Sequence, residues 1–140
     1  MANEAVIIEL LGNRGDPISF TVANATGVEK GTLMRLQTPR TAVASSGVTG
    51  VFAGIAAAEK VASDGATQLA LHTYGIFDLL MATGSACKEG DSLVMSGANA
   101  VARAVDAPGG TLGAVASGMI LGKALEDGSS AEVIAVLVGA

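Results

Sequence analysis

Apolar and polar positions alternate in short runs along most of the chain, and turn residues separate these runs. In TQLALHT (67–73), Leu69 and Leu71 share one face of an extended segment. ISFTV (18–22) alternates in the same way, and this period of two predicts half-buried β-strands. EVIAVLV (132–138) is apolar after its first residue, which is typical of a strand covered on both sides. The pattern predicts an all-β fold with less than about 15% helix, well below the usual share.

One segment favours a helix on propensity alone. AAAEKVA (56–62) has the best helix formers in the chain. Its apparent counterpart, ILGKALE (120–126), has Gly122 in its middle, where glycine opposes a helix. We therefore expect an extended segment or a single helical turn at both places.

The chain contains two similar halves. KGTLM (30–34) corresponds to EGDSLVM (89–95), and the turn QTPR after the first run corresponds to SGAN after the second. The ends of the halves are matched by pairing Gly54 with Gly118 and Asp64-Gly65 with Asp127-Gly128. Asp-Gly between two apolar runs predicts a turn. The alternative is chance similarity in a chain rich in glycine and alanine.

These patterns predict a small single-domain β-barrel or sandwich built from two similar β-rich halves, with an N-terminal arm. The predicted domain covers residues 27–140, with repeats at 27–75 and 86–139. Residues 1–26 are predicted to form an N-terminal arm or an edge strand. At 140 residues, one domain is also the default from length.

Composition limits the partners. The net charge is −5, and the eight Lys and Arg residues are scattered, so neither nucleic acid nor an anionic membrane is a predicted partner. Only 15% of residues are charged while 50% are apolar, which favours surface buried in an oligomer or on a larger partner. Residues 41–58 carry no charge, but their Gly, Ser and Thr content makes a membrane span a poor interpretation. The N-terminus lacks a basic signal-peptide region, so we expect synthesis in the cytoplasm without secretion.

No catalytic or metal-binding pattern is present. His72 and Cys87 are the single histidine and the single cysteine, which is too few for a usual zinc site within one chain. Cys87 is interpreted as a buried apolar residue and His72 as a structural one, although spacing alone leaves a Cys–His pair open. Phosphate-loop motifs are missing from the sequence. We predict a non-enzymatic chain without cofactor or metal.

Three segments together carry a resemblance to a known family. They are GIFDL (75–79), KEGDSLVMSGANAV (88–101) and LGKALEDGSSAEVIAVLVG (121–139). In this order and at this spacing they resemble the capsid cement, or head decoration, proteins of tailed bacteriophages, over about residues 54–139.

The resemblance implies a structural virion protein. Such a protein would bind the outer surface of the assembled capsid as a homotrimer and stabilise the shell by bridging subunits of the major capsid protein. The alternative that the sequence leaves open is a cellular β-barrel module that binds a small ligand or a carbohydrate.

The candidate contact residues lie near the two ends of the chain. A core closed by two matched halves leaves the N-terminal aliphatic side chains uncovered, so we predict that residues 1–12 add an edge strand to a partner chain. The alternative is that they form the first strand of their own barrel. The predicted capsid or protomer contacts are Val6, Ile7, Ile8, Leu10, Leu11 and Phe20. The predicted oligomer contacts are Val133, Ile134, Val136 and Val138 in the last strand.

Overall fold

The computed structural model describes residues 14–46, 50–104 and 117–139. These residues form ten β-strands and a 3-10 helix at Ser117–Met119, with no α-helix among them. The all-β prediction is confirmed. Within the described part of the chain, no helix has the length and apolar character needed to cross a membrane.

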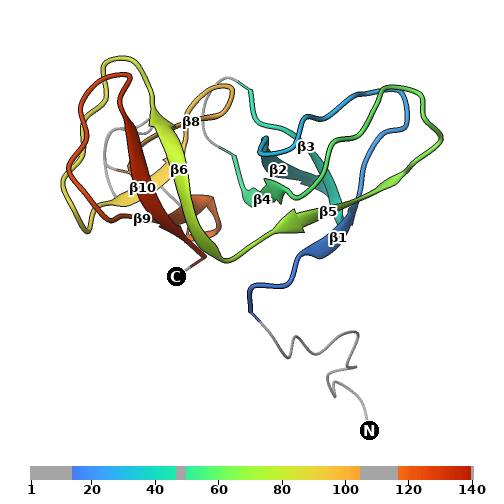
Figure 1. The fold of residues 1–140 in the computed structure, drawn as a ribbon, viewed down its shortest axis with the longest axis horizontal. Helices are drawn as coiled ribbons and strands as arrows, with labels where there is room; N and C mark the ends of the chain where they lie inside the picture. Colours follow the sequence, from blue (N-terminus) through green and yellow to red (C-terminus); the bar gives the residue numbers. More distant parts are fainter. Residues whose placement is uncertain (1–13, 47–49, 105–116, 140) are drawn as a thin grey trace, which may run out of the picture.

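The first five strands close a barrel. They follow the order β1-β3-β2-β4-β5, and β5 pairs back onto β1 (Figure 1). β1 also pairs with β3, so it is bonded on both sides and is an internal strand of this barrel. The strands are β1 (Ile18–Thr21), β2 (Leu33–Thr38), β3 (Thr41–Ala44), β4 (Phe52–Ala56) and β5 (Gln68–His72).

The next five strands repeat this topology in a second barrel, which lies beside the first (Figure 1). β6 pairs in parallel with β8, as β1 does with β3, and β10 pairs antiparallel with β6, as β5 does with β1. The fold prediction of two similar β-rich halves is therefore confirmed. The halves are β1–β5 and β6–β10, and each closes a barrel of its own. The strands are β6 (Gly75–Met81), β7 (Ser92–Met95), β8 (Ala100–Arg103), β9 (Ile120–Ala124) and β10 (Val133–Val138).

Backbone hydrogen bonds define which residues correspond between the barrels. The Gly31 N–H donates to the Ala56 carbonyl, and the Gly90 N–H donates to the Ala124 carbonyl. By this register Gly54 corresponds to Gly122, so the predicted match with Gly118 is wrong.

The equivalent loops differ in length. The bridge between Val28 and Lys60 has its counterpart between Cys87 and Gly128. Lys60 therefore corresponds to Gly128, and the predicted match of Asp64-Gly65 with Asp127-Gly128 is wrong. The loop between β4 and β5 spans residues 57–67, whereas the loop between β9 and β10 spans only 125–132. The extra residues follow Lys60 and shift the alignment.

Aliphatic and methionine side chains fill the barrels. Met34 and Leu71 are fully buried in the first, and Met81, Leu93 and Val136 are fully buried in the second. The helix-prone segment 56–62 ends β4 and continues as a loop. Its backbone N–H groups donate to other segments, from Ala57 to the Ala70 carbonyl and from Lys60 to the Val28 carbonyl, and these contacts override its helix propensity.

Leu33 and Ile55 join the two barrels. Their side chains are buried at 0% and 3% exposure, and they pack in the same cluster as the core of the second barrel. The residues at the equivalent positions of the second barrel are Ser92 and Lys123, and both are exposed. Burial of such aliphatic side chains contributes about 1.5–3 kcal/mol each, so the contact holds the barrels together.

Polar contacts supplement this junction. The Leu33 N–H donates to Asn99 Oδ1 at 3.0 Å. Ser45 Oγ donates to the Gly97 carbonyl at 3.1 Å and accepts from the Asn99 N–H at 3.3 Å. Asn99 has a φ of 56°, a left-handed conformation that asparagine tolerates well. The turn between β7 and β8 is thereby fixed onto the first barrel.

Candidate interaction surface

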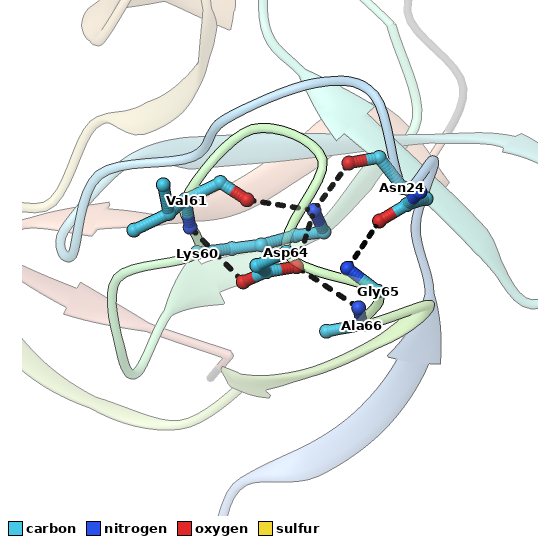
Figure 2. Close-up of polar contacts among 6 residues, drawn as sticks. All are labelled: Asn24, Lys60, Val61, Asp64, Gly65 and Ala66. Atoms are coloured by element: carbon cyan, nitrogen blue, oxygen red, sulfur yellow. Dashed lines mark hydrogen bonds and ion pairs between the residues drawn. The ribbon is translucent and has the colours of Figure 1, made fainter.

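A buried lysine anchors the loops of the first barrel. Lys60 is only 3% exposed, and its Nζ donates to the Asn24 carbonyl at 2.7 Å and to the Val61 carbonyl at 3.2 Å. Asp64 Oδ1 accepts its third hydrogen bond at 3.1 Å (Figure 2). An ammonium group has three donors, so this buried charge is fully satisfied.

Asp64 organises the loop around that lysine. Its carboxylate accepts from the Ala66 N–H at 2.9 Å and from the Val61 N–H at 3.2 Å (Figure 2). The Ala66 hydrogen bond, followed by the Lys60 contact, lowers the pKa of this carboxyl below its ordinary value. Asn24 Oδ1 accepts from the Gly65 N–H at 2.6 Å, which ties the β4–β5 loop to the loop after β1. The cluster is therefore a structural anchor.

The second barrel has a more open arrangement at its equivalent end. Asp127 Oδ1 accepts from the Glu89 N–H at 2.9 Å, and this bond is the main reason that the pKa of Asp127 is lowered. Lys88 Nζ lies 3.5 Å from the Asp127 carboxylate, but both side chains are well exposed. Exposed pairs of this kind add little stability.

The structure places His72 and Cys87 in different barrels. Cys87 is buried in the core of the second barrel, and burial raises the pKa of its thiol. His72 belongs to β5, and its ring centroid lies 5.8 Å from that of Phe77. Among the described residues, no group of three or more His, Cys, Asp or Glu side chains is placed to hold a metal ion.

Two pockets at the barrel surfaces are small. One, of about 140 Å³, is lined by Cys87, Lys88 and Arg103 together with Ala86. The other, of about 40 Å³, lies in the first barrel between the ends of β1 and β3. Small-molecule sites usually have volumes of about 300–1,000 Å³. Neither pocket therefore favours the small-ligand alternative.

The outward side of β6 and β10 exposes an aliphatic surface, which we call the β6–β10 face. Leu80 lies opposite Val133, and Ile76 lies opposite Leu137. Ile76, Val133 and Leu80 are 67%, 56% and 41% exposed. The face comprises Ile76, Asp78, Leu80, Val133, Ala135 and Leu137.

The equivalent surface of the first barrel is polar. The pair Leu80–Val133 corresponds there to Thr21–Gln68. Gln68 Nε2 donates to Thr21 Oγ1 at 3.1 Å, and Ser19 Oγ donates to Gln68 Oε1 at 2.8 Å. The same position of one fold is thus a hydrogen-bonded polar surface in one copy and an exposed aliphatic surface in the other.

The predicted contact residues fall into three groups. Val133 is exposed, whereas Ile134, Val136 and Val138 point into the core of their own barrel with at most 1% exposure. Phe20 is half-buried against the core of the first barrel. The other candidates lie outside the described residues; they are Val6, Ile7, Ile8, Leu10 and Leu11.

Sequence reasoning missed Ile76, Leu80 and Leu125 as surface residues. A usable signal was present, because GIFDLLM (75–81) has large apolar residues on both faces, as does the last strand. Two strands of this kind that pair side by side leave one apolar face outside a small barrel. Leu125 extends the face beyond β9, since its N–H donates to the Ala135 carbonyl and its side chain is 39% exposed.

The fold and this surface define a tandem β-barrel protein with one polar and one aliphatic outer face. The family model of the phage cement protein matches residues 12–140, and the chain belongs to this family of phage structural proteins. A solved structure of the head fiber gp8.5 N base in bacteriophage phi29 is similar, with 14% identity and a TM-score of 0.49. That match covers 87% of this chain and 93% of the other. No curated protein matches significantly.

Proposed function

We propose that the protein binds the outer surface of the assembled phage capsid and stabilises it by bridging subunits of the major capsid protein. The observation that carries this proposal is the match to the phage cement family over residues 12–140. The joined barrels support it, because a body that is already folded can connect two subunits without an additional ordering cost.

The proposed partner is the major capsid protein, and the proposed state of the chain is a homotrimer on the virion. The net charge of −5 supports a role without nucleic acid or membrane contacts. The proposed role is mechanical and needs no catalysis.

The N-terminal residues 1–12 are proposed to bind a partner chain. Support comes from the closure of the first barrel, in which β1 begins at Ile18 and pairs on both sides. The guanidinium of Arg14 lies 4.1 Å from the centre of the Tyr74 ring, which places the start of the described chain beside the connection between β5 and β6.

Imaging tests the capsid proposal. Purified protein is mixed with undecorated, expanded shells of the cognate major capsid protein, and the shells are examined by negative-stain electron microscopy and thermal rupture. We expect regular added density on the outer surface, saturable binding and a higher rupture temperature. Unassembled capsid subunits serve as the control. Shells that remain bare at saturating protein would refute the proposal.

A further inference from the structure

We propose that the β6–β10 face joins copies of this chain to one another, with the β6 side of one copy against the β9 side of the next. This goes beyond the capsid proposal, because it assigns a surface to contacts between copies. In Figure 1, β6 and β10 lie side by side on the barrel that carries this face.

The first argument is the concentration of exposed aliphatic side chains. Ile76, Leu80, Val133 and Leu125 are between 39% and 67% exposed, and all four lie on or beside three adjacent strands. Contiguous apolar patches of this kind mark protein contacts, whereas single exposed aliphatic residues are ordinary.

The second argument is the internal comparison. The first barrel shows that the fold is compatible with threonine and glutamine at the positions of Leu80 and Val133. Aliphatic residues there are consequently not required to build a barrel. Their presence on the second barrel alone indicates a contact that only this barrel makes.

The third argument uses charge to identify a second copy of the chain as the partner that binds this face. Asp78 lies on β6 opposite Ala135, and Lys123 lies on β9 opposite Leu137, so β10 separates an exposed acid from an exposed base. When the β6 side of one copy meets the β9 side of the next, Asp78 approaches Lys123 of its neighbour while the aliphatic residues cluster between them. The face is therefore complementary to a second copy of itself.

An alternative symmetry is disfavoured by the same charges. A two-fold axis running across the strands would stack β6 on β6 and bring two Asp78 carboxylates together. Like charges that face each other across an interface destabilise it. The contact between the β6 side of one copy and the β9 side of the next, which is a head-to-tail contact, keeps the Asp78 carboxylates apart. Repeated around a three-fold axis, this contact closes a trimer.

The apolar part of the contact is tested by giving the second barrel the residues of the first. The variant Leu80→Thr with Val133→Gln should raise the concentration of half-dissociation by about 100-fold or more in sedimentation and light scattering. The matched control is Leu36→Thr with Val61→Gln, which removes two exposed aliphatic residues elsewhere and should leave self-association unchanged. Circular dichroism checks that both variants stay folded.

Charge reversal tests the orientation. Asp78→Lys and Lys123→Asp should each weaken self-association by about 5- to 10-fold, and the double variant should recover most of the loss. If neither single variant changes the dissociation constant, or if the double variant is no better than the singles, the head-to-tail contact is wrong.

Shell binding separates this proposal from the capsid proposal. A wild-type chain that stays monomeric at about 100 µM, well above ordinary micromolar affinities, would overturn the self-contact. The self-contact is also overturned if Leu80→Thr with Val133→Gln keeps its oligomer but no longer decorates shells, because the face would then contact the capsid. A dissociated variant that still binds shells weakly supports both proposals.

Discussion

At the scale of single residues, the main feature is a buried ammonium group that behaves as part of the core. Lys60 corresponds to Gly128 of the second barrel, where neighbouring side chains occupy the space that a Cβ would need. The nearest of them are Ile134, Met81 and Cys87. In the first barrel the lysine stem fills the equivalent site and carries its charge to two carbonyls and a carboxylate.

Replacing this lysine should be costly. Lys60→Met would remove the donor of the Val61 carbonyl and leave the Asn24 carbonyl with the Ser63 N–H alone. We expect a loss of about 2–4 kcal/mol in the free energy of unfolding. Urea denaturation measures it. Lys88→Met is the matched control, because that side chain is 80% exposed and should change stability by less than about 0.5 kcal/mol. Equal effects for the two variants would contradict a structural role for Lys60.

Asp64 makes stability depend on pH. Its pKa is lowered below the ordinary value of 3.8 in the folded state, so its contribution is complete above that value and is lost as the pH falls through the folded pKa. Asp64→Asn should lower the urea midpoint at pH 7 and flatten its decline between about pH 5 and pH 2.5. Some decline should remain, since the pKa of Asp127 is lowered too. An unchanged profile in Asp64→Asn would refute the assignment.

At the scale of strands, two equivalent glycines allow close approach of neighbouring backbones. A Cβ on Gly54 would lie 2.7 Å from Leu71 Cβ and 2.9 Å from the His72 carbonyl oxygen. On Gly122 it would collide with the carbonyl oxygen of Leu137. Both glycines therefore belong to the packing of their barrels.

Alanine scanning distinguishes these glycines from Gly118. Gly54→Ala and Gly122→Ala should each destabilise by about 3 kcal/mol, because backbone atoms must move to admit the methyl group. Gly118→Ala should change stability by less than about 0.5 kcal/mol, since its Cβ would lie 3.6 Å from Val51 Cγ1, an ordinary contact. Thermal denaturation compares the three. A severe loss in Gly118→Ala alone would contradict these packing roles of Gly54 and Gly122.

The strands themselves could be predicted from the sequence, and their closure could not. Alternation located 18–22 and 67–73, because burial of one face leaves every second residue apolar. A continuous apolar run located 132–138, although only one face of that strand is buried. Strand pairing depends on contacts between residues far apart in the chain, so local patterns do not show it. In addition, the β4–β5 loop is longer than the β9–β10 loop, which shifts the correspondence between the two barrels after Lys60.

Candidate surface residues were harder still to predict. In the last strand, the prediction named Val133 together with its buried neighbours, since a fully apolar run does not show which face points inward. Nor could spacing show that Leu33 lies outside its own barrel and is covered by the second one. Both facts depend on contacts between segments far apart in the chain.

At the scale of the whole molecule, we expect the chain to fold without residues 2–12, because described strands close both barrels. Deleting residues 2–12 should shift the melting temperature by less than about 2 °C, because β1 begins at Ile18 and both its neighbours are present. Shell decoration should fall, since this segment is proposed to bind a partner. Calorimetry and negative-stain imaging provide the two readouts.

A point variant serves as the control for this deletion. Ile8→Asp should weaken assembly in the same direction while leaving the melting temperature nearly unchanged. Unfolding or aggregation of the truncated chain would show that residues 2–12 belong to its own core.

The junction residues of the first barrel have no aliphatic counterpart on the second barrel. Leu33 and Ile55 form an aliphatic surface on the first barrel, and the second barrel covers it. A second barrel with aliphatic residues at the same two positions would expose an equivalent surface to a barrel of another molecule. Such end-to-end contacts extend without limit into filaments. Ser92 and Lys123 occupy these positions in the second barrel, so this barrel lacks the aliphatic pair that forms the junction on the first. The terminal repeats of solenoid proteins likewise carry polar outer faces, which limit further end-to-end contacts.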